Sequence, residues 1–331
     1  MPYSLKTLME PDTVLVVTAS YDIAADYVLN ALEARGTPAF RLDTDRFPLS
    51  IRASFRPPDV IEFNADGETL SGTSVKSVWY RRHVLPQLPD EMDAGLREFS
   101  EREARAFLSG VLAALPTDHW MSSPRAIAQA ERKPYQLTVA ERLGFRVPTT
   151  LITNDPPAVI EMAGCRQLIA KAVSSGYVTS PEGNRAIFTN VVQPEHLEEL
   201  DGLPLAPVVF QELVDKVSDI RVTVVAQEVF AAEILSQGHP SSQTDWRATD
   251  DPHLPHRTHA LAEETADLCR RLVRDLGLVY GAIDLALLED DTYVFFEINP
   301  NGEWLWLEDQ LGFPISDTIL LQFGGCPTPG M

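Results

Sequence analysis

Two apolar segments near the C-terminus constrain the fold most strongly. Residues 281–289 and 292–300 flank the pair Asp290-Asp291. A two-residue turn at these aspartates predicts an antiparallel hairpin in which Asp284 lies opposite Glu297. Period-two alternation then predicts two faces. The predicted buried face consists of Ile283, Leu285, Leu287, Val294, Phe296 and Ile298. The predicted polar face consists of Ala282, Asp284, Ala286, Glu297 and Asn299.

The polar face of this hairpin predicts a metal site. Like charges directly opposite each other in a sheet repel, so the pair Asp284 and Glu297 requires compensation. A hard cation between them is the simplest explanation, because Mg²⁺ prefers oxygen ligands such as two carboxylates and the amide oxygen of Asn299. The neighbouring alanines leave room for phosphates. The alternative is an acidic sheet face that is only solvated, and the residue types alone leave both interpretations open.

The overall charge limits the ligands that the chain can bind. Its 331 residues include 48 acidic and 27 basic side chains, and the formal net charge is −21. A nucleic-acid backbone requires a basic surface, so this balance predicts no nucleic-acid partner. Any anionic ligand must therefore be bound by a few cations at defined positions.

The sequence predicts a cytoplasmic protein. No apolar run approaches the roughly 18 residues of a membrane span, so we expect no membrane association. The cysteines Cys165, Cys269 and Cys326 lie far apart and form no CxxC motif. This spacing suggests neither a zinc ribbon nor a disulfide framework, and it agrees with a reducing compartment.

Strands and helices alternate along the chain, which predicts an α/β (α+β) fold. A strand at 14–19 and a helix at 22–35 open a first domain that we expect to end near Pro124. A helix over 126–143, ending at Gly144, introduces a second group of strands. The further expected strands are 39–43, 77–82, 148–153, 167–173, 186–192, 208–214, 219–226 and 229–236. The further expected helices are 91–115 and 258–276.

Candidate phosphate-binding groups must come from outside the standard glycine-rich motifs, because neither GxxxxGK[ST] nor GxGxxG occurs. Lys171 is the only charge in the apolar segment 167–173, so we expect a bound anion or a carboxylate near it. An edge position with the ammonium in solvent is the alternative. The polar loop 174–184, with Gly176 and Gly183, could fold over phosphates, although an ordinary hairpin loop has the same composition.

A second cationic position is Arg221, in the segment DIR at 219–221. Asp219 and Arg221 are two residues apart in an expected strand and so project from one face. Arg221 could bind a phosphoryl or carboxylate oxygen bidentately, with Asp219 orienting the arginine or a substrate group. An ion pair at a strand edge is the alternative. The HxxHxxH run His253, His256 and His259 is a weaker metal candidate, because Pro252 and Pro255 predict a solvated loop.

Taken in order, Lys133, Lys171, FQELV at 210–214, DIR and the set Asp284, Glu297 and Asn299 resemble the ATP-grasp ligases. The resemblance covers essentially the whole chain and implies three domains. These are a pre-ATP-grasp α/β domain (1–124), a central domain with the lid (125–214) and a C-terminal catalytic domain (215–331). It also implies that Lys133 and Lys171 bind ATP phosphates, and that Asp284, Glu297 and Asn299 hold Mg²⁺. The implied adenine-binding hinge strand is Gln211, Glu212, Leu213 and Val214.

A narrower resemblance points to the graspetide synthetases, the microviridin-type maturases. It is carried by WYRR (79–82), DIRVTVV, VFAAEILSQ, DWR (245–247), YGAIDL and EINPNGEWLWLE. One departure is Ala226-Gln227, where a glycine-containing turn is expected. Members of this family cross-link a ribosomal precursor peptide through side-chain esters or amides. The Arg pair in WYRR could face the active site or could be an exposed strand end.

The family implies a reaction and its partners. ATP phosphorylates an Asp or Glu side chain of the peptide, and a Ser or Thr hydroxyl or a Lys amine then displaces phosphate, with Arg221 and Asp219 as the catalytic residues. Because the enzyme itself is acidic, local cations must hold the acidic core peptide, and a leader segment brings affinity. The leader is expected near the hairpin at 174–190 and the acidic segment 193–200, and a homodimer is expected. Two alternatives remain open. One is a ligase that adds amino acids to a peptide or small carboxylate, and the other is a non-catalytic ATP-binding or peptide-binding module.

Overall fold

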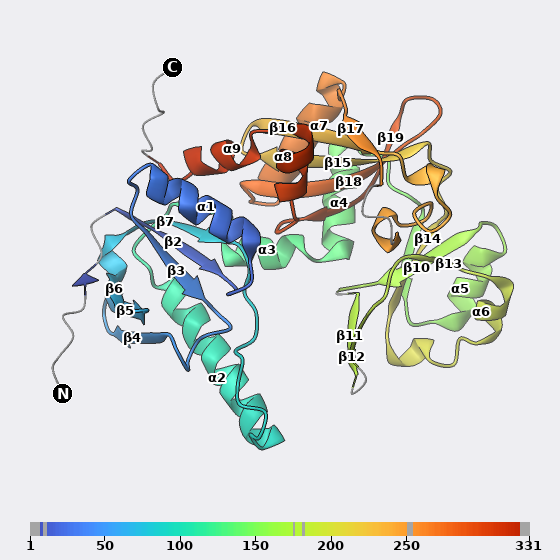
Figure 1. Cartoon of the computed structure of the whole chain (residues 1–331). Coiled ribbons are helices and arrows are strands. Elements are labelled where there is room, and N and C mark those ends of the chain that lie inside the picture. Colours follow the sequence, from blue (N-terminus) through green and yellow to red (C-terminus); the bar gives the residue numbers. More distant parts are fainter. Residues whose placement is uncertain (1–6, 9–11, 175, 181–182, 250–253, 325–331) are drawn as a thin grey trace. The chain divides into compact units, whose positions relative to one another are not determined.

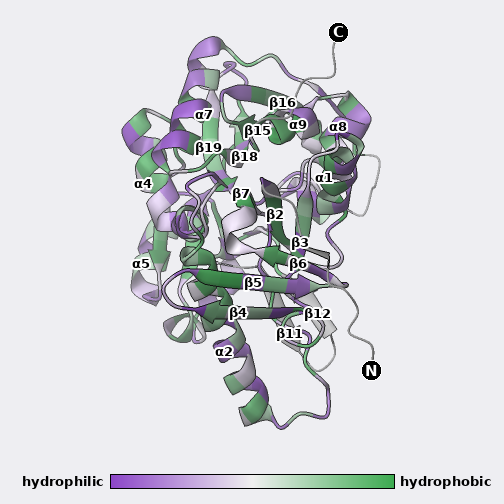
Figure 2. Cartoon of the chain, turned by 90° about the vertical axis from the view of Figure 1, so that its left-hand side faces the viewer, coloured by the Kyte–Doolittle hydropathy of each residue, from purple (hydrophilic) through white to green (hydrophobic). Residues whose placement is uncertain are grey.

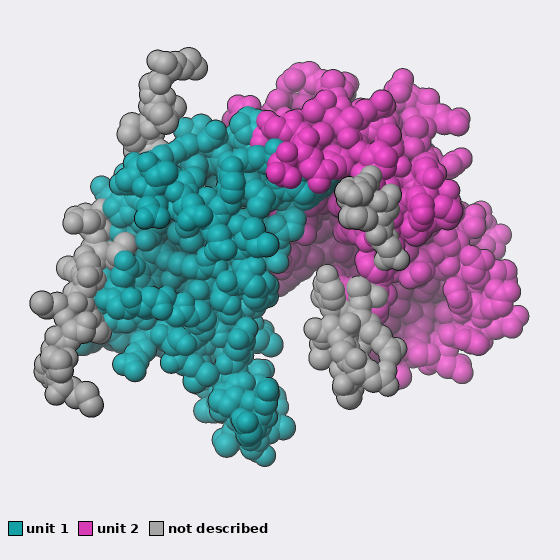
Figure 3. All heavy atoms as spheres, in the orientation of Figure 1, with its two compact units in different colours: residues 1–124, 303–308, 314–331 teal, residues 125–302, 309–313 magenta. Residues whose placement is uncertain are grey.

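The computed structural model describes residues 7–8, 12–174, 176–180, 183–249 and 254–324 (Figure 1). The chain forms two compact units, coloured separately in Figure 3. Unit 1 comprises residues 1–124, 303–308 and 314–331, and unit 2 comprises residues 125–302 and 309–313. The α/β class is as predicted. The division into three domains at residues 124 and 214 remains a prediction.

Unit 1 contains a parallel sheet with the strand order β3-β2-β7-β8. Its strands are β2 (Thr13–Thr18), β3 (Ala39–Asp43), β7 (Val75–Tyr80) and β8 (Trp120–Met121). Helix α1 (Ile23–Ala34) joins β2 to β3, and the Asp22 carboxylate caps it by accepting a hydrogen bond from the Ala25 N–H. Gly36 follows with φ +67°, a conformation that glycine adopts without strain. The predicted strand–helix opening is therefore confirmed.

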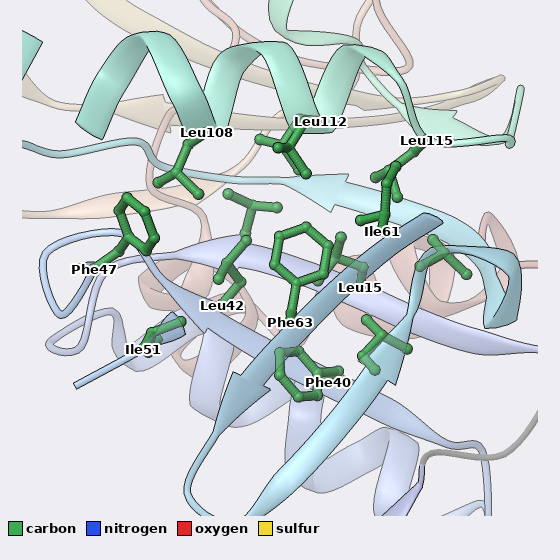
Figure 4. Packing of buried hydrophobic residues seen from close by; sticks show 14 of the residues in the cluster. Leu15, Phe40, Leu42, Phe47, Ile51, Ile61, Phe63, Leu108, Leu112 and Leu115 are labelled. Carbon is green, nitrogen blue, oxygen red and sulfur yellow. The ribbon is translucent and has the colours of Figure 1, made fainter. Parts of the chain in front are cut away.

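A second sheet in unit 1, with the order β1-β6-β5-β4, was not predicted. Its strands are β1 (Thr7–Leu8), β4 (Arg52–Arg56), β5 (Val60–Ala65) and β6 (Glu68–Ser71), and the short helix η1 (Gly72–Ser74) follows β6. In Figure 2, which is coloured by hydropathy, strand β5 and helix α2 (Ala94–Ala113) each carry both hydrophobic and hydrophilic residues. Figure 4 shows Leu108 and Leu112 of α2 directed toward Phe63 of β5, with Leu15 and Phe40 of the parallel sheet beside them. These side chains form the core of unit 1.

Unit 2 begins at Arg125, within α3 (Pro124–Ala130), and α4 (Lys133–Leu143) follows. The prediction of one continuous helix over 126–143 was wrong. Pro134 has no N–H, and its ring would clash with the carbonyl of Ala130, so the first helix ends there and a second begins. The predicted end at Gly144 is confirmed, since this glycine has φ +103° and closes α4.

The first sheet of unit 2 has the order β13-β10-β14-β9. Its strands are β9 (Thr150–Thr153), β10 (Leu168–Ala172), β13 (Asn190–Val191) and β14 (Val208–Glu212). The sheet packs with α5 (Pro156–Ala163), and the nearby short helices are α6 (Pro194–Glu198) and η2 (Leu203–Leu205). A separate hairpin consists of β11 (Tyr177–Ser180) and β12 (Gly183–Ala186). The predicted single strand over 186–192 is therefore wrong, because β12 ends at Ala186 and β13 covers only two residues.

The second sheet of unit 2 is antiparallel, with the order β17-β16-β15-β18-β19. Its strands are β15 (Ser218–Val225), β16 (Glu228–Ile234), β17 (His256–Thr258), β18 (Tyr280–Leu287) and β19 (Tyr293–Asn299). Helix α7 (Glu263–Asp275) buries Ala266, Cys269, Leu272 and Val273. This helix begins later than predicted, because residues 256–258 form β17 instead of a loop. Ala226 in the turn after β15 has φ +53°, so alanine occupies a position that favours glycine.

The turn of the β18–β19 hairpin is longer than predicted, but Asp284 pairs with Glu297 as predicted. The Leu288 N–H donates to the Thr292 carbonyl, so the loop consists of residues 289–291, with Asp291 at φ +60°. The pairing then shifts by one residue between Asp284 and Leu285, where Phe296 is the additional residue of a bulge. The longer loop and the bulge compensate for each other.

The remaining elements are η3 (Ser236–Gly238), η4 (Trp246–Ala248), α8 (Leu305–Leu311) and α9 (Ile315–Leu321). No helix within the described ranges has the length and apolar character needed to cross a membrane. Cys165 is exposed and Cys269 is buried, and both are free thiols. Cys326 and His253 lie outside the described residues.

Candidate active site

Asp284 and Glu297 lie directly opposite each other in the β18–β19 hairpin, as the sequence predicted. Asp284 is only 6% exposed, and the Glu297 side chain is half-buried. The alternative of a merely solvated acidic face is therefore wrong. The bulge changes the predicted faces, because Val294 pairs with Ala286, and Phe296 lines the same cavity as the two carboxylates.

Lysine and arginine side chains from separate segments meet these carboxylates. Lys133, at the start of α4, places its Nζ 3.0 Å from Glu297 Oε2. Arg247, in η4, places its Nη1 3.0 Å from Glu297 Oε1 and 4.0 Å from Asp284 Oδ2. The repulsion between the opposed acids is thus already compensated by protein cations.

Lys171 of β10 lines the same cavity as Glu297. Burial lowers the pKa of the Lys171 ammonium, and the charge of Glu297 partly offsets this effect. The expectation of a carboxylate near Lys171 is therefore confirmed. Burial alone would raise the pKa of the Glu297 carboxyl, but Lys171, Lys133 and Arg247 together hold it well below its usual range. Glu297 thus pairs with two cations, Lys133 and Arg247, and lines the same cavity as a third, Lys171.

Arg221 and Asp219 project from the same face of β15, as predicted, but they have different partners. Arg221 Nη1 donates to Asp284 Oδ1 at 2.9 Å, whereas Lys216 Nζ donates to Asp219 Oδ1 at 2.8 Å. Asp284 is therefore a carboxylate partner of Arg221, and the role of Asp219 in orienting the arginine or a substrate group stays a prediction. The strand-edge alternative is wrong, since β15 is bonded on both sides and both side chains are buried. Burial raises the pKa of the Asp219 carboxyl, and Lys216 opposes this shift.

The residues predicted to meet adenine border the same cavity. Gln211 is buried at the end of β14, where its Nε2 donates to Thr150 Oγ1 at 2.8 Å. Glu212, Leu213 and Val214 continue along the cavity wall. The apolar part of the wall also includes Ile169, Trp246 and Phe296. A mixed apolar and hydrogen-bonding wall of this kind suits a flat heterocyclic base.

Asn299 is the remaining predicted metal ligand. It pairs with Ala282, two positions from the Asp284–Glu297 pair, and its exposed side chain accepts a hydrogen bond from the Asn301 N–H at 2.9 Å. No cluster of three His, Cys, Asp or Glu side chains suited to a metal occurs in the part of the chain that the structure describes. Two carboxylates and an amide oxygen nevertheless fit Mg²⁺, because an amide oxygen can accept a second contact.

In unit 1, the arginines of WYRR are not an exposed strand end. Arg81 is 2% exposed, and its Nη2 donates to Glu303 Oε2 at 2.8 Å, while its Nε lies 3.2 Å from Asp22 Oδ2. Arg82 also pairs with Glu303. In unit 2, one member of the HxxHxxH run that was a weak metal candidate has other contacts. His259 pairs with Tyr293 and Glu233.

Comparison with known proteins decides the family. The family model for the MvdD pre-ATP-grasp domain matches residues 13–128. The macrocyclase MdnC from Microcystis aeruginosa MRC, solved with precursor peptide MdnA, is 34% identical over 93% of this chain and 97% of that chain, with a TM-score of 0.84. The chain belongs to the graspetide synthetases. The predicted family is thus confirmed, and with it the ATP-grasp fold and the enzyme class of ATP-grasp ligase.

Two further ATP-grasp ligases have similar structures. A RiPP-associated ATP-grasp ligase from Chryseobacterium gregarium, solved with ADP and a leader and core peptide, is 28% identical over 93% of this chain and 95% of that one, with a TM-score of 0.85. PsnB, solved with a minimal precursor, Mg and ADP, is 25% identical over 96% and 100%, with a TM-score of 0.74. Curated proteins gave no significant match.

Sequence reasoning missed two cations of this graspetide synthetase. Arg247 lies 2.9 Å from Asp245 and also pairs with Glu297. Lys216 donates to both the Asp219 carboxylate and the Thr244 carbonyl. Both belong to segments without regular periodicity, so no pattern predicts where their side chains point. The only signal was the DWR motif at 245–247, which carried the family resemblance without an assigned role.

Proposed function

We propose that this chain is an ATP-dependent peptide macrocyclase. It phosphorylates Asp or Glu side chains of a ribosomal precursor peptide and joins them to Ser or Thr as esters or to Lys as amides. The observation that carries this proposal is a cavity in unit 2 lined by Lys171, Arg247, Asp284 and Glu297. Lys133 pairs with Glu297 at this cavity, and Arg221 pairs with Asp284. Relatives solved with precursor peptide, ADP and Mg support the same assignment.

The residues of the cavity suit MgATP. We assign Lys133 and Lys171 to the phosphates and the segment from Gln211 to Val214 to adenine, with Arg247 as a third cation for the phosphates. Asp284, Glu297 and Asn299 would hold Mg²⁺. When bound, MgATP supplies a phosphoryl group that converts a poor electrophile, the carboxylate, into one with a good leaving group.

The protein's part in this reaction is to position and neutralise charge. Arg221 presents a planar pair of N–H donors, a geometry that matches a carboxylate or a phosphoryl group. Its pairing with the buried Asp284 fixes one side of the guanidinium. Asp219, held by Lys216, is the carboxylate that we assign to orient the attacking hydroxyl or amine. The enzyme needs no side-chain nucleophile of its own.

The precursor peptide is the proposed partner. We place its leader at the central part of unit 2, near the β11–β12 hairpin and α6, where Glu195 and Glu198 are exposed. The acidic core is attracted locally by Arg221, since the chain as a whole carries a net charge of −21. A homodimer and a cytoplasmic location complete the proposal.

Intact-mass measurement tests the function. A short peptide rich in acids and in Thr, Ser or Lys, encoded beside this gene, is incubated with enzyme, Mg²⁺ and ATP. Macrocyclisation removes one water from the peptide for each ring, whereas a ligase that adds amino acids increases the mass. An unchanged peptide without ATP turnover would instead indicate a binding module. The control is Arg221→Ala, which should abolish ring formation.

A further inference from the structure

The loop that follows β19 folds back against the Arg221 side chain. Within residues 299–302, the Gly302 N–H donates to the Asn299 carbonyl at 3.3 Å, and the Asn301 N–H donates to the Asn299 side-chain oxygen at 2.9 Å. These hydrogen bonds close the turn on itself. Gly302 is buried at its end.

Gly302 has no room for a side chain. A Cβ at this position would lie 2.6 Å from Arg221 Nη2 and 2.4 Å from the Ala282 Cβ, both far inside van der Waals contact. The Gly302 backbone therefore packs directly on the guanidinium. Because Arg221 Nη1 is paired with Asp284, the loop and the carboxylate confine the guanidinium from two directions.

Tyr280 holds this loop in place through a hydrogen bond. Its buried hydroxyl donates to the Gly302 carbonyl at 2.7 Å. Tyr280 begins β18, and Asp284 lies four residues further along the same strand. One strand thus fixes Arg221 directly through Asp284 and indirectly through Tyr280 and Gly302.

We propose that Tyr280 and Gly302 are positioning residues that hold the Arg221 guanidinium in place against the peptide side-chain carboxylate that is activated. This inference rests on the proposed function, because it requires Arg221 to contact that carboxylate. An arginine fork recognises a carboxylate in a defined plane, so a small displacement of the guanidinium weakens the reaction more than it weakens nucleotide binding.

The first test compares two single-hydroxyl deletions in the same sheet. Tyr280→Phe removes the bond to Gly302, and Tyr293→Phe, the matched control, removes the bond to His259 at 2.7 Å. Tyr280→Phe should lower kcat for cross-linking about threefold to tenfold, the worth of one hydrogen bond, with the KM for ATP unchanged. Equal effects of the two variants on kcat, or a parallel loss of ATP affinity, would overturn the proposal.

The second test uses the space at Gly302. Gly302→Ala should lower kcat about 100-fold. Adding Ala282→Gly removes the contact with the Ala282 Cβ but leaves the one with Arg221, so the defect should persist in the double variant. Recovery of normal activity in that double variant would show that Ala282, and not Arg221, causes the effect, and would contradict the proposal.

A spectroscopic readout separates this inference from the proposed function. In NMR spectra of arginine side chains, the Arg221 guanidinium signals should shift in Tyr280→Phe and stay in place in Tyr293→Phe. This measurement needs no peptide and no ATP. If the wild type forms no cross-links, the proposed function fails while the spectra still decide the positioning role. Unchanged Arg221 signals in Tyr280→Phe would refute it.

Discussion

Asp284 and Glu297 are direct cross-strand neighbours, and protein cations neutralise both carboxylates. Asp284 pairs with Arg221 at 2.9 Å, and Glu297 pairs with Lys133 and Arg247 at 3.0 Å each. The opposition of two acids therefore does not by itself require a metal. Two features support the proposed magnesium site. One is the type of ligand atom, and the other is the position of the pair beside Lys133, Lys171 and Arg247, the cations that we assign to the phosphates of ATP.

The two carboxylates should be indispensable for magnesium-dependent turnover. We expect Asp284→Asn and Glu297→Gln each to lower peptide-dependent ADP release at least about 100-fold and to raise the Mg²⁺ concentration needed for half-maximal rate. Glu289→Gln, in the exposed loop of the same hairpin, is the matched control and should behave as wild type. A normal magnesium titration in Glu297→Gln would exclude this residue as a ligand.

Arg247 should contribute to nucleotide affinity. Its removal deletes charge-assisted contacts of the kind worth about 1.5–3 kcal/mol each, so Arg247→Ala should weaken MgADP binding about tenfold or more. Calorimetry gives the affinity directly. The control is Arg274→Ala on α7, where Arg274 is exposed and lies 3.2 Å from Asp275. Equal MgADP affinities in the two variants would show that Arg247 does not contribute to nucleotide binding.

Lys171 and Glu297 should titrate as a linked pair. The pKa of Lys171 is lowered by burial and raised by Glu297, so NMR titration of methyl-labelled lysine should give a value below the ordinary one of about 10.4. Glu297→Gln should lower it further. The Glu297 pKa is depressed in the folded state, so its contribution to stability should be present above about pH 4.3 and lost as the pH falls. The same Lys171 pKa in the wild type and in Glu297→Gln would contradict the pairing.

The β15–β16 turn offers a test of backbone strain. Ala226 has φ +53°, which costs an L-residue about 1–2 kcal/mol, whereas glycine adopts it freely. Ala226→Gly should therefore raise the free energy of unfolding by up to about 1 kcal/mol, and Ala226→Val should lower it. Chemical denaturation of both variants measures the difference. A decrease in stability in Ala226→Gly would show that the turn is not strained.

Local patterns in the sequence predicted much of this site, in part through compensating errors. The Asp284–Glu297 register was predicted from a two-residue turn that does not exist, and the bulge at Phe296 restores it. Lys171 was recognisable because a lone charge in an apolar strand requires a partner. The placement of Arg247 and the pairing of Asp219 with Lys216 depend on tertiary contacts of irregular segments, and period or propensity carries no information about these.

The central claim is that the enzyme activates a peptide carboxylate by phosphoryl transfer. The most direct measurement uses a precursor peptide whose Asp and Glu carboxylates carry heavy oxygen, incubated with ATP and Mg²⁺. When the hydroxyl or amine displaces phosphate, the bond between the carbonyl carbon and the bridging oxygen breaks, so one carboxylate oxygen leaves with phosphate. The account predicts one heavy oxygen in the released phosphate for each ring formed. Rings formed with unlabelled phosphate would contradict it.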